Sequence, residues 1–172
     1  MNPRKHHNII FYFLLMTAFS STLFAAIDTD KLLPIKINAD KIDVKADVHQ
    51  IIYMGHVELT QGSTHLIADK AITIGDSHDK LSEAIVFGNK TTLAHAWSET
   101  EADKPPTHIY ADVIHYYPDK HLVTLVGHAK VIQDKNSLEA PKINYNLETK
   151  HVTTESNTSA RTHITFFPEK KS

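Results

Sequence analysis

Strict alternation of apolar and polar residues dominates the chain beyond its first 26 residues. From 50 to 60, every odd position carries an apolar residue or glycine, and most even positions are polar. The stretch from 122 to 132 has the same pattern at its odd positions. A period of two with many β-branched residues predicts strands, and the clusters of Gly, Pro, Asp, Asn and Ser between these runs predict turns. Because no helical stripe follows the first 26 residues, the pattern indicates an all-β protein.

The pattern is written twice, at an offset of 72 positions. The dipeptide at 39–40 recurs at 111–112, and the dipeptide at 55–56 recurs at 127–128, without a gap. A finer repeat lies inside each half, and its four strand–turn–strand units open at Ala39, Ala68, Ala111 and Ala140. Repeats of one such unit stack to bury a continuous core, and the end units keep unpaired edges.

The phase of the alternation changes at each Ala-Asp step. Ile37 and Ile42 lie on opposite parities, as do Ile109 and Ile114. A bulge or corner at each step would bend the strand and keep its apolar residues inward. Strands that bend and pass between two sheets form a folded-over sandwich. The sequence therefore predicts an elongated antiparallel β-jelly roll with two open ends.

The segments outside the alternating runs predict how the chain is divided into a signal peptide, a domain and a tail. The first residues combine a basic start with the short apolar run 9–15 and a small-residue ending, which is the layout of a secretory signal peptide. We expect a signal peptide at 1–25, a jelly-roll domain at 26–168 and a frayed tail at 169–172. An uncleaved anchor formed by residues 9–26 is the alternative. The acidic segment 98–107 contains two Pro and is predicted to be a loop at the midpoint between the halves.

The amino-acid composition argues against some covalent links and some binding partners. The 172 residues include no Cys, which excludes both a disulfide framework and an acylated cysteine. Loss of Arg4 and Lys5 with the signal peptide takes the formal charge from −2 to −4. Nucleic-acid binding calls for a basic face, so a mildly acidic chain is a poor candidate for it.

Candidate chemistry is sparse. The 13 His include no HExxH motif and no HxH pair on one strand face, so we interpret them as surface residues and expect no metal and no cofactor. Asp40, Asp69 and Asp112 recur with the repeat, which favours turn chemistry over a catalytic pair. No GxSxG elbow is present, so we expect no enzyme. Trp97 fits either a core position or the mouth of a binding groove.

Several segments, taken in order, resemble the OstA-like family. They are "PIKINADKIDV", "MGHVELTQGSTHLIADKAIT", "GNKTT" and "YADVIHYYPDKHLVTLVGHAKVIQDKNSLEAPKINY", and the resemblance spans about 33–167. It implies a β-jelly roll open as a groove, in which lipopolysaccharide moves with its acyl chains inside. It further implies end-to-end self-association and a bridge from an LptC-like inner-membrane component to an LptD-like outer-membrane component.

The predicted groove combines both lines of reasoning. The family resemblance implies groove roles for Ile35, Ile37, Leu93 and Tyr116. Alternation adds five inward positions: Tyr53, Val57, Phe87, Val123 and Leu125. A sealed core explains inward residues equally well, since alternation marks only the buried face. For edge-strand pairing with the next protein we expect Ile37 and Ala39 at one end, and Thr165 and Phe166 at the other.

The main interpretation is thus a periplasmic, non-enzymatic lipopolysaccharide carrier that serves outer-membrane assembly. One alternative is a membrane-anchored LptC-like component of the same system. A second, from another class, is a self-assembling structural β protein with a sealed core and no ligand.

Overall fold

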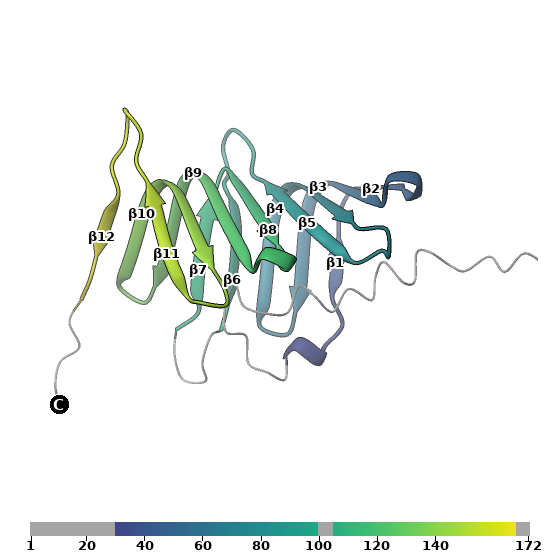
Figure 1. The fold of residues 1–172 in the computed structure, drawn as a ribbon, viewed down its shortest axis with the longest axis horizontal. Coiled ribbons are helices and arrows are strands. Elements are labelled where there is room, and N and C mark those ends of the chain that lie inside the picture. The colour runs from purple at the N-terminus through teal and green to yellow at the C-terminus, as the bar shows by residue number, and fades with distance from the viewer. Residues whose placement is uncertain (1–29, 100–104, 168–172) are drawn as a thin grey trace, which may run out of the picture.

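The computed structural model describes residues 30–99 and 105–167. The predicted signal peptide and the predicted tail at 169–172 lie outside these ranges. The described residues form one antiparallel sheet of twelve strands, which follow one another along the longest axis of the molecule (Figure 1). The strands are β1 (Lys36–Asn38), β2 (Lys41–Lys45), β3 (Gln50–Gln61), β4 (Thr64–Gly75), β5 (Leu81–Phe87), β6 (Ala94–Ser98), β7 (Thr107–Ala111), β8 (Val113–Tyr117), β9 (Leu122–Gln133), β10 (Asn136–Asn146), β11 (His151–Glu155) and β12 (His163–Thr165). Three 3-10 turns accompany them: η2 (Asp30–Leu32), η3 (Ala46–Val48) and η4 (Pro118–Lys120).

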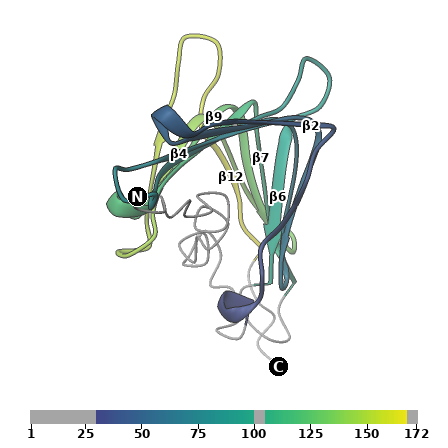
Figure 2. The same ribbon diagram turned by 90° about the vertical axis from the view of Figure 1, so that its right-hand side faces the viewer.

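The sheet is folded along a corner into two layers. The long strands β3, β4, β9 and β10 pass through both layers, whereas the other strands form short pairs that are interrupted at the corner. One layer has the order β2-β3-β4-β5-β8-β9-β10-β11, and the other has the order β1-β3-β4-β6-β7-β9-β10-β12. Viewed along the long axis, the two layers diverge from the corner (Figure 2). This arrangement is the predicted β-jelly roll.

The sequence repeat is also a structural repeat. Strand β9 begins and ends 72 positions after β3, and η4 follows η3 at the same offset. His49 and His121, which end these two turns, both have positive φ, at 49° and 47°. Strand β6 ends at Ser98 and β7 begins at Thr107, so the junction of the halves falls where the acidic segment predicts it.

Each corner is fixed by a bulge and a carboxylate. In β3, Gly55 and His56 both have positive φ, and they interrupt the pairing with β4 between Met54 and Val57. The Asp40 amide donates to the Gly55 carbonyl over 2.9 Å, and His56 Nδ1 donates to the Asp40 carboxylate over 2.7 Å. A bulge re-aims the side chains that follow it and bends the strand.

The second half contains the same corner. Gly127 and His128 have φ values of 72° and 45°, and His128 Nδ1 lies 2.9 Å from Asp112 Oδ2. Gly is required because φ is positive and because an added Cβ on Gly127 would clash with that oxygen. Asp40 and Asp112 therefore hold the two corners, as the turn-chemistry interpretation predicts, whereas Asp69 accepts a hydrogen bond from Asn89 in the loop after β5.

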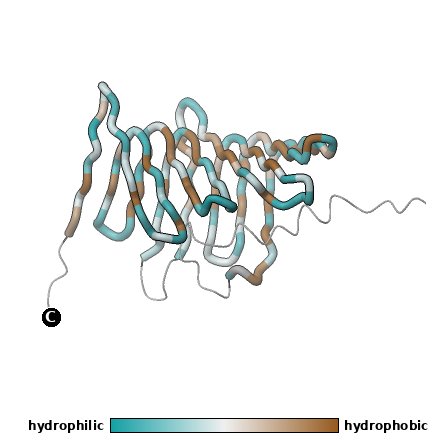
Figure 3. Tube along the Cα trace, viewed as in Figure 1, coloured by the Kyte–Doolittle hydropathy of each residue, from teal (hydrophilic) through white to brown (hydrophobic). Residues whose placement is uncertain are grey.

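Burial confirms the change of phase at the alanine steps. On β4, Leu66 and Ala68 are buried, and the next buried residue is Ala71, which lies three positions on. The same step separates Ala140 from Ile143 on β10. Apolar residues therefore face the interior on both sides of each bend, and hydropathy alternates along the strands (Figure 3).

Candidate functional site

A continuous apolar surface lines the interior between the two layers. Twenty-two buried hydrophobic residues from β3 to β10 and the turn that follows β10 make up one cluster. Among the largest fully buried side chains are Leu81, Ile143, Val57 and Val123. Burial raises the pKa of the Tyr53 hydroxyl, and it raises that of Tyr116 to about 12, with Asp119 adding to the latter. Both phenols therefore stay neutral, and the interior offers an apolar lining.

The structure brings seven of the nine predicted groove residues to this interior. Tyr53, Val57, Tyr116, Val123 and Leu125 belong to the buried cluster, with 1 to 6 % of each residue exposed. Ile35 and Ile37 are partly buried and pack against the same cluster. These contacts fit both a lipid-lined groove and a sealed core.

Phe87 is a misplaced prediction. Ala84 and Val86 are the buried residues of β5, so Phe87, at the next position, faces the outer side of the sheet. There Lys70 Nζ lies 5.6 Å from the centre of its ring. The error arises because a register shift between Ile74 and Gly75 on β4 changes the parity of β5.

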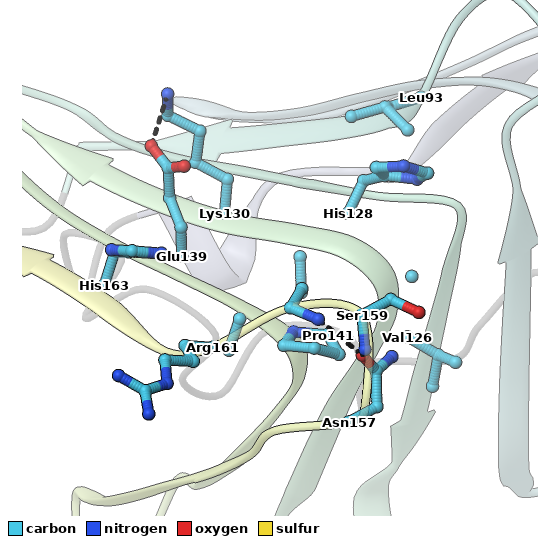
Figure 4. Close-up of a pocket in the computed structure, with 14 residues that line it drawn as sticks. Leu93, Val126, His128, Lys130, Glu139, Pro141, Asn157, Ser159, Arg161 and His163 are labelled. Atoms are coloured by element: carbon cyan, nitrogen blue, oxygen red, sulfur yellow. Dashed lines mark hydrogen bonds and ion pairs between the residues drawn. The ribbon is translucent and has the colours of Figure 1, made fainter.

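Leu93 also lies outside the interior. It precedes Ala94, which is fully buried, and it lines an open pocket of about 670 Å³ on the outer side of the corner (Figure 4). The loop between β5 and β6 interrupts the alternation, so the residue after "GNKTT" does not continue the inward series. The turn between β11 and β12, which contains Asn157 and Ser159, forms the other side of this pocket.

The predicted edge strands lie at the two ends of the sheet. Among the described residues, β1 pairs with β3 alone, and Ile37 lies opposite Leu59; Ala39 follows directly. At the other end, β12 pairs with β10 alone, and Thr165 lies opposite Ser137. Phe166 follows β12 and is 76 % exposed. Both ends thus leave strand edges without a described partner strand.

Exposed apolar side chains gather at these ends. Ile42 and Val44 lie opposite Tyr53 and Ile51 in the register, so they face the interior, yet about half of each is exposed. At the far end Ile164 lies opposite Leu138 and is 71 % exposed. The apolar interior therefore continues to both ends of the molecule.

Sequence reasoning missed a cluster of rings on the outer face of β4, β6 and β7. His65, Trp97, His95, His108 and Tyr110 are stacked with nearly parallel planes. The sequence pattern predicts solvated positions for the three His of this cluster, and a core or groove-mouth position for Trp97. No sequence signal reports this cluster, because it depends on the pairing of β4 with β6 across the intervening β5.

Two further features, a metal-binding cluster and a membrane-spanning helix, are absent from the described residues. Within residues 30–99 and 105–167, no group of three or more His, Cys, Asp and Glu side chains is placed to hold a metal ion. Over the same ranges, no helix combines the length and the apolar character needed to cross a membrane.

Comparison with known proteins places these features in a class of lipid-export proteins. The family described as LptA/(LptD N-terminal domain) LPS transport protein matches residues 36–151. The lipopolysaccharide export system protein LptH of Pseudomonas aeruginosa is 31 % identical over 136 residues, which are 79 % of this chain and 76 % of LptH. The chain belongs to the LptA/LptD N-terminal domain family.

Two further comparisons agree. The lipopolysaccharide export system protein LptA of Escherichia coli K12 is 26 % identical over 119 residues, covering 69 % of this chain and 61 % of LptA. The crystal structure of LptH, the LptA-homologous periplasmic component of the transport device of P. aeruginosa, superimposes with a TM-score of 0.69 at 27 % identity. That match covers 81 % of this chain and 99 % of the LptH chain. These relatives support the main interpretation and not the LptC-like alternative.

Proposed function

We propose that this chain is a periplasmic lipopolysaccharide carrier that shields acyl chains between the two layers of its jelly roll. The observation that carries the proposal is the apolar interior, which runs from Ile37 and Ile42 at one end to Leu138 and Ile164 at the other. The family match and the export function named for LptH and LptA support it.

The energetics favour such a carrier. Each acyl CH₂ removed from water contributes about 0.8 kcal/mol, so a lipid with several chains crosses water only when it is shielded. The interior supplies Ile, Val, Leu and Tyr side chains, and the sugar headgroup can remain in water. This activity needs a continuous apolar wall and no catalytic group, so we propose a protein without enzymatic activity.

The two ends supply the connections of the bridge. An edge strand can pair with the edge of another protein by β-augmentation, in which main-chain hydrogen bonds give affinity. We propose that β1 and β12 pair in this way, both with further copies of the chain and with LptC-like and LptD-like components at the two membranes. The signal peptide at 1–25 would deliver the domain at 26–168 to the periplasm.

Substitution of Ile37 tests the lipid-carrying role. Purified protein would be incubated with lipopolysaccharide, and the bound lipid would be extracted and measured by mass spectrometry. Ile37→Asp should lose most of the bound lipid, because a charge would sit on the apolar interior. Lys36→Asp is the matched control, since its side chain lies on the exposed opposite face of the same strand. Unchanged lipid binding by a folded Ile37→Asp protein would refute the proposal.

A further inference from the structure

The ring cluster on the outer face joins the two halves of the chain. His65 comes from β4, His95 and Trp97 from β6, and His108 and Tyr110 from β7. Strand β6 is the last strand of the first half, and β7 is the first strand of the second. Ring centres of neighbouring members lie 4.2 to 4.9 Å apart in the closest pairs. The cluster is remote from the apolar interior, because Ala94, Ala96 and Ile109 occupy the inward positions of β6 and β7.

Within this cluster, two imidazole nitrogens face each other. His95 Nε2 lies 3.0 Å from His108 Nδ1, so one ring donates its N–H to the lone pair of the other. The antiparallel register fixes this diagonal pair, since His95 lies opposite Tyr110 and His108 lies opposite Trp97. The stacked neighbours restrain both rings. Two ring nitrogens from different strands are therefore held at a short separation.

The separation of the nitrogens suits a metal ion. With metal–nitrogen bonds of about 2.0 Å, adjacent ligands are about 2.8 Å apart in a square plane and about 3.3 Å apart in a tetrahedron. The observed 3.0 Å lies between these values. In the observed state the N–H of one ring points at the lone pair of the other, so both rings would have to turn within the stack before the two lone pairs converge on one ion. Among divalent ions, Cu²⁺ favours tetragonal nitrogen sites and stands highest in the affinity order.

We propose that His95 and His108 form a two-histidine site for a divalent transition-metal ion, with Cu²⁺ preferred over Ni²⁺ and Zn²⁺. Water molecules would complete the coordination. The ion would tie β6 to β7 and so link the two halves of the jelly roll from outside. This site is independent of the proposed lipid-carrying role.

The electrostatic surroundings allow the ion to bind. A neutral imidazole offers the lone pair of a ring nitrogen to a metal ion. The nearest cation in the same cross-strand row is Lys130, which lies opposite Tyr110. Its Nζ is held 2.8 Å from Glu139 Oε1, which offsets its charge.

Trp97 provides a local readout. It is the sole Trp of the chain, and its ring centre lies 4.6 Å from that of His95 and 6.2 Å from that of His108. Cu²⁺ bound between these two rings would quench its fluorescence by short-range contact. Copper bound at distant His residues would quench it far less. Titration of the purified protein with CuCl₂ at pH 7.5 should therefore give saturable quenching, and the ion should raise the melting temperature.

Ring-preserving variants test the assignment. His95→Phe and His108→Phe keep the stack and remove one ligand each. Each should weaken the affinity for Cu²⁺, measured by quenching, by at least about tenfold. Even the loss of a residue that only supports a metal ligand costs about that much. Each should also abolish the rise in melting temperature. His65→Phe is the matched control, because His65 stacks on Trp97 at 4.9 Å without a paired nitrogen. It should bind Cu²⁺ as the parent does.

Two outcomes would overturn the proposal. One is unchanged quenching in both the His95 and His108 variants when circular dichroism shows them folded. The other is an equal loss in the His65 control. Should one of the Phe variants fail to fold, Gln at the same position (His95→Gln or His108→Gln) offers a smaller replacement. Retained quenching there would count equally against the site.

Discussion

The two halves of this protein share strands and corners but differ in what covers them. Ile42 and Val44 on β2 correspond, 72 positions on, to Ile114 and Tyr116 on β8. The first pair is 50 % and 48 % exposed, whereas the second pair is 3 % and 6 % exposed. Strand β8 lies between β5 and β9, but β2 pairs with β3 alone among the described residues. The same position is therefore core when a further unit stacks on it and an open end when none does.

This difference explains why the ends are suited to association. Fully burying a side chain of the size of Val or Ile contributes about 1.5–3 kcal/mol. In the second half this stabilisation is realised inside the chain, because β5 pairs with β8 and covers its apolar residues. At β2 it is available only to another protein that adds the next strand. Each end of a chain of repeats thus exposes the apolar surface on which a further unit would stack.

The largest effect should come from shortening equivalent residues in the two halves. Ile114→Ala should lower the free energy of unfolding by about 2–5 kcal/mol, because it leaves a cavity in the core. Ile42→Ala should change it by only about 0.5 kcal/mol, because the side chain is already half exposed. Urea denaturation of the two variants measures both values. Similar losses in both variants would show that the two positions are equally buried in solution.

The second-largest effect should come from placing a charge at the open end formed by β2, which should weaken end-to-end association. Val44→Glu should weaken end-to-end association by about tenfold or more, since the exposed half of this apolar side chain is no longer available for burial and a charge would be buried in its place. Analytical ultracentrifugation over a range of concentrations measures this. Ile67→Glu is the control, because Ile67 is exposed to a similar degree, at 44 %, but lies on the outer face. If Ile67→Glu weakened assembly and Val44→Glu did not, association would involve the outer face.

The corners should respond alike in both halves. Gly127→Ala should cost about 1–3 kcal/mol of stability, since φ is +72° and the new Cβ would meet Asp112. Gly55→Ala should cost a similar amount at the equivalent corner, where φ is +74° and Asp40 is the obstacle. Thermal unfolding of the two variants tests this symmetry. A neutral result at either glycine would contradict the role of the bulge.

The smallest effect is the pH dependence of stability that comes from the contact between His56 and Asp40. The hydrogen bond from His56 to Asp40 raises the pKa of His56 above its ordinary value of 6.5. A raised pKa in the folded state means that the contact stabilises the fold below about pH 6.5 and that this contribution is lost as the pH rises through the folded pKa. The effect on stability is slight because the side chain is 89 % exposed. Titration by NMR should show the raised pKa, and Asp40→Asn should abolish it.

The strands, the repeat and the corners could be predicted from the sequence because each is a local pattern. Alternation marks the inward residues of β3 and β9, and the phase change after Ala111 marks a bend. Phe87 and Leu93 were misplaced because a register shift in β5 and the loop before β6 reset the parity. The hydropathy pattern does not show how these two interruptions change the parity of the residues that follow them.

The outer ring cluster could not be predicted at all. His95 lies on β6, which ends at Ser98, and His108 lies on β7, which begins at Thr107. His65 reaches Trp97 only because β4 pairs with β6 as well as with β5. Each His taken singly looks like a solvated residue on the polar face of a strand. Their proximity depends on which strands pair, and alternation within a strand carries no information about that.

Photo-crosslinking in cells is the most direct test of whether lipid acyl chains occupy the interior. A photoreactive amino acid would replace Leu125 or Val86, which face the interior, or Phe87, which faces outward on the same strand as Val86. After irradiation, the protein would be blotted for lipopolysaccharide. A lipid-filled interior predicts adducts at Leu125 and Val86 and none at Phe87. Adducts at Phe87 alone, or none at the inward positions of folded, exported protein, would contradict it.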